Sequence, residues 1–235
     1  MARPRWLPTL AAFLLAALCL VLGRWQWDKA DRKQAQGRLY FLAGGLPELD
    51  WAGAQMLGAA AHYRRVHLQG EFIWSYRIWL DNRVQAGRAG YHLVVPLHLE
   101  QGEVLLVNRG WRPVGVDRSR LPEVPLPAGR RNVVGILVPA QGRYLELGGL
   151  PDTGRLWQNL DMARYRAWFD AGLPDLLLLE TSGAGDGLVQ DWPPPDVGAE
   201  RHRAYAVQWY ALATLSLGLW GYFSLWKSRG GGDDR

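Results

Sequence analysis

Two apolar stretches lie near opposite ends of this chain and enclose a largely polar central region. Residues 7–23 and residues 204–226 contain no charged side chain. A helix of about 20 apolar residues crosses a hydrocarbon layer about 30 Å thick, and both stretches are at or near that length. The sequence therefore predicts a membrane protein with two transmembrane helices, and not a soluble enzyme.

Aromatic residues flank both stretches, as they do where tryptophan and tyrosine settle at the two surfaces of a membrane. They are Trp6, Trp25 and Trp27 beside the first stretch, and Tyr205, Trp209, Trp220, Tyr222 and Trp226 in the second. A cleaved signal peptide is an alternative for the first stretch, because Arg3 and Arg5 precede it. No clear small-residue cleavage site ends the run, so an uncleaved anchor is favoured.

Basic residues in the tails predict the orientation. Two spans place both tails on one side of the membrane, and short flanks rich in lysine and arginine stay in the cytoplasm. The prediction puts residues 1–6 and 227–235 in the cytoplasm and residues 24–203 outside it, in a periplasm or an equivalent compartment. Four basic residues between positions 24 and 33 give the opposite signal. Long loops, however, cross a membrane largely regardless of their charge.

The central region is predicted to form one β-rich extracytoplasmic domain. Its first part has helix-forming composition and should continue the first span outward until Gly44 and Gly45 stop it. Beyond Trp51, apolar and polar residues alternate as in half-buried strands, for example from Leu93 to Leu99. The segments VLLVNRG and NVVGILVP are apolar on both faces and are predicted to be central, covered strands.

Turn signals and short elements complete this expectation. Gln101 and Gly102 predict a tight hairpin turn, and the glycine-rich residues 81–91 predict a longer connection. A short helix is expected over residues 161–169 with Asp161 as N-cap, followed by a last strand, LLLLE. Residues 182–199 should form an extended connector back to the membrane. A partly closed barrel fits these elements, although the sequence does not fix the strand order.

The central region has no strong catalytic or nucleic-acid-binding signature. It contains no serine-hydrolase elbow, zinc-protease motif, phosphate-binding loop or covalent haem motif. The single cysteine, Cys19, lies in the first apolar stretch, which excludes an internal disulfide and a thiol pair for copper or redox chemistry. The formal charge of +5 comes from scattered residues without one basic stripe. We therefore expect neither an enzyme nor a nucleic-acid-binding protein.

Most histidines are expected to be surface residues. His92 and His98 share one predicted strand face, but six residues of strand separate them by about 20 Å, too far for one metal ion. We expect both to face solvent. His62 and His67 lie near the first strand without a second clustered ligand, so they are also expected at the surface.

His202 differs because it lies at the outer mouth of the second span. On a helix it shares one face with Tyr205 and Trp209. A neutral imidazole beside apolar and aromatic surface is a common axial ligand of haem iron. The same ring could instead be hydrated among lipid headgroups. Gln208, about two turns further on, could hydrogen-bond the first span or a bound ligand.

Arginines and small residues add to this region. Two spans bring Arg24 to the same membrane surface as Arg201 and Arg203. Guanidinium groups there could hold carboxylates such as haem propionates, or equally lipid headgroups.

Small residues on the spans would let the helices approach each other, or a partner's spans, closely. They are Ala11, Ala12, Ala16, Ala17, Ala211, Thr214, Gly218 and Gly221.

Four segments give a specific resemblance. They are LGRWQWDK at the end of the first span, HYRRVHLQGEFI, GYHLVVPLHLEQGEVLLVNRGWRP, and HRAYAVQWYALA at the second span. Together they resemble the surfeit locus family of cytochrome c oxidase assembly factors, in the right order and over nearly the whole chain. Arg203 stands where relatives often have an apolar residue, and Tyr210 where phenylalanine is common.

The resemblance implies an integral protein of the bacterial inner membrane that assists delivery or insertion of haem a into the catalytic subunit of cytochrome c oxidase. A histidine ahead of the Y-A-x-Q-W motif is the proposed haem contact in that family. It corresponds to His202, which the resemblance therefore predicts to be an axial iron ligand. The residues expected at the haem a site are His202, Tyr205, Gln208, Trp209, Arg24 and Arg203.

The resemblance also implies partners and leaves an alternative open. The implied partners are the catalytic subunit of the oxidase, haem a synthase and membrane lipid. The alternative is a haem-independent membrane scaffold that stabilises an oxidase assembly intermediate. Gly23, Trp25 and the stretch Asn108 to Trp111 match further family motifs. We expect that stretch to be a structural strand end and turn, and contact with a partner is the alternative.

Overall fold

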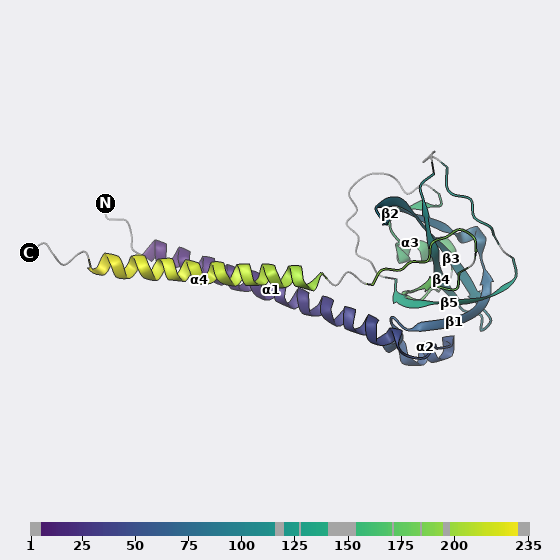
Figure 1. Cartoon of the computed structure of the whole chain (residues 1–235), viewed down its shortest axis with the longest axis horizontal. Coiled ribbons are helices and arrows are strands. Elements are labelled where there is room, and N and C mark those ends of the chain that lie inside the picture. The colour runs from purple at the N-terminus through teal and green to yellow at the C-terminus, as the bar shows by residue number, and fades with distance from the viewer. Residues whose placement is uncertain are drawn as a thin grey trace, which may run out of the picture. The chain divides into compact units, whose positions relative to one another are not determined.

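The computed structural model describes residues 6–115, 120–126, 128–140, 154–170, 172–183, 185–194 and 198–229, with side chains up to residue 224. The chain divides into two units, Met1–Arg38 with Pro194–Arg235 and Leu39–Pro193. The first unit contains most of α1 (Trp6–Gly44) and all of α4 (Ala199–Arg229), and the second contains the β-rich domain (Figure 1). The predicted order of an apolar helix, a β-rich domain and a C-terminal helix is confirmed.

α1 is one helix of 39 residues that ends at Gly44, so the predicted helical continuation of the first apolar stretch up to Gly44 is confirmed. Of the helices that the structure describes, α1 alone is long and apolar enough to cross a membrane, by length and composition only. α4 has 31 residues but is less apolar, in keeping with Gln208 and the aromatic residues within it. The second span therefore stays a prediction.

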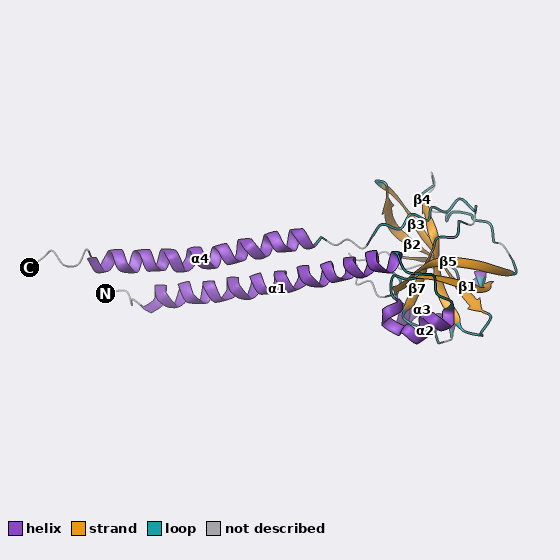
Figure 2. Cartoon of the chain, turned by 60° about the horizontal axis from the view of Figure 1, so that its bottom comes forward, coloured by secondary structure: helices purple, strands orange, loops and turns teal. Residues whose placement is uncertain are grey.

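The second unit is built on a sheet of seven strands (Figure 2). The strands are β1 (Arg65–Phe72), β2 (Ile78–Gln85), β3 (Arg88–Leu99), β4 (Val104–Pro113), β5 (Arg130–Pro139), β6 (Leu156–Trp157) and β7 (Leu176–Glu180). Their order is β1-β5-β7-β4-β3-β2-β6, and β1 also pairs with β3. These pairings join β1, β5, β7, β4 and β3 in a closed circuit, from which β2 and β6 extend. A partly closed barrel is consistent with this circuit and stays a prediction.

Apolar residues from the two faces of the sheet enter two separate clusters. α2 (Trp51–Leu57) and the 3-10 turn Gly58–Ala61 contribute to one cluster, and α3 (Met162–Phe169) to the other; a second 3-10 turn is Trp74–Tyr76. Leu93 of β3 enters the first cluster and its neighbour Val94 enters the second, as strand alternation requires. Because both faces are covered, β4 and β5 lack polar alternation, and their predicted central placement is confirmed.

Several short elements lie where the sequence predicts them. The β3–β4 hairpin turns at Gln101 and Gly102, and β7 is the segment LLLLE. The carboxylate of Asp161 caps α3, because it accepts hydrogen bonds from the backbone nitrogens of Ala163 and Arg164 at 2.9 and 3.1 Å.

The glycine-rich residues 81–91 are not a longer connection, contrary to our expectation. β2 continues to Gln85, β3 begins at Arg88, and only Ala86 and Gly87 form the turn. Their φ angles of 47° and 75° suit a tight two-residue hairpin turn. Gly90 lies within β3, where a Cβ would overlap the carbonyl of Arg112. This glycine therefore reflects close packing of strands and not a loop.

Arg109 is the extra residue of a β-bulge in β4. Leu93 pairs with Gly110 and Val94 with Asn108, which leaves Arg109 without a partner on β3. Gly110 has a φ of 141°, and a Cβ there would lie 2.9 Å from the carbonyl oxygen of Val189. The Asn108–Trp111 stretch is therefore not a strand end and turn, because it lies inside β4.

The bulge leaves the Arg109 side chain only 1% exposed. Its Nε lies 3.0 Å from Oε2 of Glu180, and its Nη2 lies 2.9 Å from Oδ2 of Asp186. The guanidinium also lies 4.8 Å from the ring centroid of Phe72 and 5.3 Å from that of Trp74. Burial raises the pKa of Glu180, and the charge of Arg109 opposes that shift. This buried ion cluster connects β1, β4, β7 and the segment at residue 186.

The predicted extended connector packs against the domain as far as Trp192. Trp111 and Val189 exchange two backbone hydrogen bonds of 2.8 Å. The side chain of Gln190 donates to the carbonyl of Arg109, and the indole of Trp192 donates to the carbonyl of Glu180. Glycine and proline made this segment resemble a free linker, but its large polar and aromatic side chains attach it to β4 and β7.

His92 is half-buried, so the expectation that it faces solvent is wrong. The amide nitrogen of Asn108 lies 3.2 Å from Nδ1 of His92, and the ring of Trp192 packs edge-on against the imidazole at 5.3 Å. Burial and the charge of Arg83 lower the pKa of His92 to about 4. His98 is exposed, as expected. The two differ because Trp192, distant in sequence, covers His92.

The depressed pKa of His92 predicts a loss of stability in acid. Its neutral ring is favoured in the fold, so its contribution is full above about pH 6.5 and falls as the pH drops toward about 4. The loss should reach at most about 1.4 kcal/mol per pH unit. Thermal unfolding of the full chain across this pH range should show a weaker dependence for His92→Gln. The exposed-site control His98→Gln should keep the wild-type dependence, and equal slopes in all three proteins would contradict the account.

Arg109→Leu should destabilise the second unit strongly, because Glu180 and Asp186 would stay buried without their cation. Loss of one partner of a buried ion pair costs about 3–5 kcal/mol, which corresponds to a Tm lower by about 6–20 °C. Near-UV circular dichroism of the full chain in detergent measures this. Arg130→Leu is the control, since Arg130 also forms an ion pair but is 76% exposed. Similar Tm losses in the two variants would refute the role of burial.

Candidate functional site

α1 and α4 meet along a seam whose positions recur every three or four residues. On α1 these positions are Ala16, Cys19, Gly23, Gln26 and Ala30, and on α4 they are His202, Ala206, Trp209, Ala213, Ser216 and Trp220. All are buried or half-buried, and this spacing is that of a coiled coil. The helices run antiparallel, since α1 reaches Trp220 through Thr9 and His202 through Gln26 (Figure 2). His202 therefore lies on the surface shared by the two helices.

Small side chains allow close approach in the middle of this seam. Ala16, Cys19 and Ala213 form a buried cluster against Trp209. Gly23 is buried, and a Cβ added there would lie 2.6 Å from the ring of Tyr210. The Tyr210 ring therefore occupies the space that a side chain at position 23 would need.

The small residues were expected to pair with the other helix or with a partner's spans, and most of them do not face the other helix. Ala16 is in the seam, Ala12 accepts a hydrogen bond from Ser216, and Gly221 is half-buried. The remaining five are exposed, namely Ala11, Ala17, Ala211, Thr214 and Gly218. The small residues that allow the close approach are mostly others, such as Cys19, Gly23 and Ala213. The three-and-four spacing decides which residues lie in the seam, and small size alone does not.

His202 forms a hydrogen bond across the seam to α1. Its Nδ1 lies 2.8 Å from Oε1 of Gln26, and both side chains are half-buried. An amide oxygen only accepts hydrogen bonds, so this contact suits the tautomer in which Nδ1 carries the proton. In the neutral ring the lone pair is then on Nε2. This is the tautomer in which Nε2 can bind a metal ion.

Arg203 binds α1 at the same end of the pair. Its Nη2 donates to the amide oxygen of Gln34 and lies 3.6 Å from Oδ1 of Asp31. Nη1 lies 3.8 Å from Oε1 of Glu200 on its own helix. The guanidinium is 33% exposed. Its charge is thus already opposed by carboxylates of this chain.

Polar contacts also join the opposite end of the pair. The indole of Trp220 donates to the hydroxyl of Thr9 at 3.1 Å, and Ser216 donates to the carbonyl of Ala12 at 3.2 Å. The Trp220 ring packs edge-on against Phe13 at 5.1 Å. The seam therefore has hydrogen bonds at both ends and small apolar side chains between them.

The other expected site residues lie around His202 in different ways. Tyr205 is 46% exposed, Gln208 is exposed, and Trp209 packs into the seam. Arg24 lies 3.1 Å from Asp28 and is 76% exposed. It is two residues from Gln26, about 200° around α1, and so lies away from the face that meets His202.

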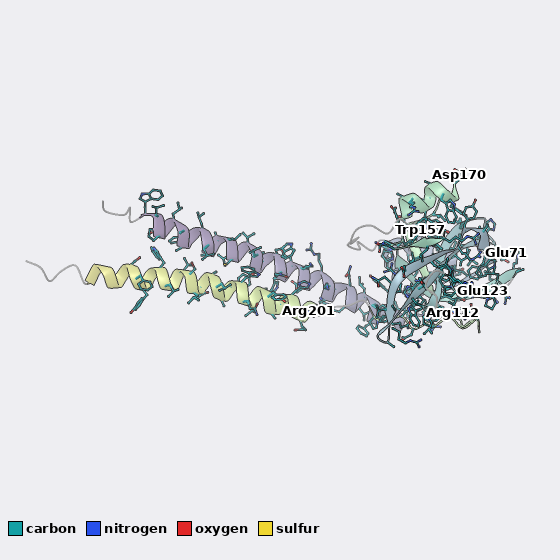
Figure 3. All side chains as sticks on the ribbon, turned by 90° about the horizontal axis from the view of Figure 1, so that it is seen from above. Glu71, Arg112, Glu123, Trp157, Asp170 and Arg201 are labelled. Atoms are coloured by element: carbon teal, nitrogen blue, oxygen red, sulfur yellow. The ribbon has the colours of Figure 1, made fainter. Side chains whose placement is uncertain are left out.

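Arg201, labelled in Figure 3, is exposed near the start of α4. The sequence reasoning missed Gln26 and Gln34, the α1 partners of His202 and Arg203. The spacing from Ala16 to Ala30 contained a signal for Gln26, because it continues a three-and-four pattern out of the apolar stretch.

A sequence model of the SURF1 family matches residues 13–214. The chain belongs to the SURF1 family. A SURF1-like protein of Rickettsia felis is 22% identical over 214 residues, 87% of this chain and 91% of the relative. A SURF1-like protein of Rickettsia bellii is 25% identical over 218 residues, 87% of this chain and 85% of the relative.

A further relative is the cytochrome oxidase assembly protein SHY1 of Saccharomyces cerevisiae. It is 32% identical over 111 residues, which are 43% of this chain and 28% of SHY1. The SURF1-family match contains the whole of both seam faces up to Ala213, including His202 and Gln26. The family that the four sequence segments indicated is therefore confirmed.

In this SURF1-family chain, Gly23→Leu should open the helix seam, because the new side chain would displace the Tyr210 ring. Cys19 reports on opening, since it is the single cysteine and is 2% exposed. The labelling rate of Cys19 by a small maleimide should rise several-fold in Gly23→Leu. Gly218→Leu is the matched control, because an added Cβ there meets nothing within 4 Å. Unchanged labelling in Gly23→Leu would contradict close packing at this position.

Proposed function

We propose that this chain assists assembly of cytochrome c oxidase and that its helix pair holds haem a through His202 during delivery to the catalytic subunit. Family membership and similarity to SHY1, named as an assembly protein, support the role in assembly. The observation that carries the haem proposal is the 2.8 Å contact between His202 Nδ1 and Gln26 Oε1, which suits the tautomer whose Nε2 has the lone pair that binds a metal.

The residues around His202 are not equally suited to bind haem a. His202 would bind the iron, and Tyr205 and Trp209 on the same helix would offer aromatic surface to the macrocycle. Arg203 would have to divide its charge between a propionate and Asp31. When bound, haem a supplies a redox-active iron for the oxidase, whereas the residues of this chain bind and orient it.

Arg24 and Gln208 are the weaker members of the proposed set. Arg24 points away from the seam face of α1, and Gln208 is exposed on α4. Either side chain would reach a ligand only from outside the helix pair. We propose no chemical step for these residues and no enzymatic activity for the chain.

We propose that both helices span the inner membrane of a bacterium, with cytoplasmic tails and the β-rich domain in the periplasm. Exposed apolar side chains on both helices support lipid contact. They include Leu14, Leu18 and Val21 on α1 and Val207, Leu215 and Leu219 on α4. The proposed partners are the catalytic oxidase subunit, haem a synthase and membrane lipid.

A haem-independent scaffold is the second candidate. It is favoured by the seam itself, where His202 and Arg203 already have partners on α1. In that case these residues hold the two helices together, and the chain stabilises an oxidase intermediate without a bound cofactor. The two candidates differ in whether the imidazole of His202 is needed for haem a insertion.

Complementation separates these candidates. In cells that lack this protein, the wild-type chain should restore haem a in mature oxidase, and His202→Ala should restore several-fold less while still co-purifying with the catalytic subunit. His98→Ala is the control, because His98 is exposed on β3. Full restoration by His202→Ala would remove the haem role and favour the scaffold. No effect of the wild-type chain on oxidase would reject assembly altogether.

A further inference from the structure

We propose that Gln26 is the positioning residue of His202, and that it fixes the tautomer in which Nε2 has the lone pair. This inference rests on the proposed function. Oε1 of Gln26 lies 2.8 Å from Nδ1 of His202. Gln26 stands on α1 and His202 on α4, 176 residues apart, so only the helix pairing brings them together.

An acceptor at Nδ1 decides where the proton of a neutral imidazole sits. The two ring nitrogens are distinct, and the hydrogen bond made by one determines whether the other can act as a ligand. Metal-binding histidines commonly donate their other N–H to an oxygen acceptor, which also orients the ring. Gln26 supplies such an acceptor from the facing helix.

The seam places this amide within reach. Gly23 lies one helical turn before Gln26, and the absence of a side chain there lets Tyr210 and α4 lie close. Ala30, one turn after Gln26, is fully buried. Small residues on either side thus hold the two helices near enough for a glutamine to reach the imidazole.

A neutral amide suits a histidine at a membrane border. A carboxylate in its place would add a negative charge at the seam and make the imidazole a more basic ligand. Glutamine gives the orientation without that charge. Asp31 and Gln34 contact the neighbouring Arg203. These contacts also join the two helices, and they are distinct from the hydrogen bond between Gln26 and His202.

The tautomer can be measured without haem. Nitrogen NMR of the full chain in lipid nanodiscs, with labelled histidine at a pH of about 8, reports which ring nitrogen carries the proton. His202→Ala identifies the His202 signals. Wild type should have the proton on Nδ1, Gln26→Leu should move it largely to Nε2, and Gln26→Glu should restore it to Nδ1.

Gln34→Leu is the matched control, because it removes a glutamine that also bridges the helices, through Arg203. It should leave the His202 tautomer unchanged. An unchanged tautomer in Gln26→Leu, or an equal change in Gln34→Leu, would overturn the positioning role, since a merely structural contact would give one of these results.

Haem a titration of the same proteins separates this inference from the proposed function. If wild type binds haem a, Gln26→Leu should bind it about 10-fold or more weakly, and Gln34→Leu nearly as well as wild type. A chain that binds no haem a would reject the haem proposal but leave the tautomer result to decide the role of Gln26. Equal haem affinity in wild type and Gln26→Leu would overturn the positioning role.

Discussion

The close approach of α1 and α4 at Gly23 is the constraint on which the candidate site depends. The Tyr210 ring fills the space beside this glycine, and Ala16, Cys19 and Ala213 continue the contact toward the opposite end. At this separation a glutamine side chain is long enough to reach from one helix to the other. The contacts of His202 with Gln26 and of Arg203 with Gln34 both follow from that approach.

The β-rich domain depends on a different interaction, the buried charge of Arg109. A bulge in β4 points this side chain inward, and Glu180 and Asp186 neutralise it. Asp186 belongs to the segment that continues to Trp192, and Trp192 in turn covers His92 and binds the carbonyl of Glu180. Through its ion pairs, one bulged residue of β4 thus links this strand to β7 and to the segment that follows β7.

Local patterns predicted much of the fold. Helix-forming composition predicted α1 up to Gly44, and Asp161 predicted the start of α3. Long-range packing caused the errors: glycines at 87 and 90 serve a tight turn and strand packing, and Trp192 covers His92. At the site, the sequence pointed to His202, and the spacing on α1 contained a signal for Gln26. The contact between the two depends on the register of the two helices, which the sequence does not supply.

The haem a content of the purified full chain shows whether the helix pair holds haem a through His202. The protein should be isolated in detergent from cells that make haem a, and its optical spectrum and extracted haem compared with those of His202→Ala and His98→Ala. The wild type and His98→Ala should contain stoichiometric haem a, and His202→Ala should have lost it. A wild type as free of haem as His202→Ala, or haem retained by that variant, would contradict haem binding through His202.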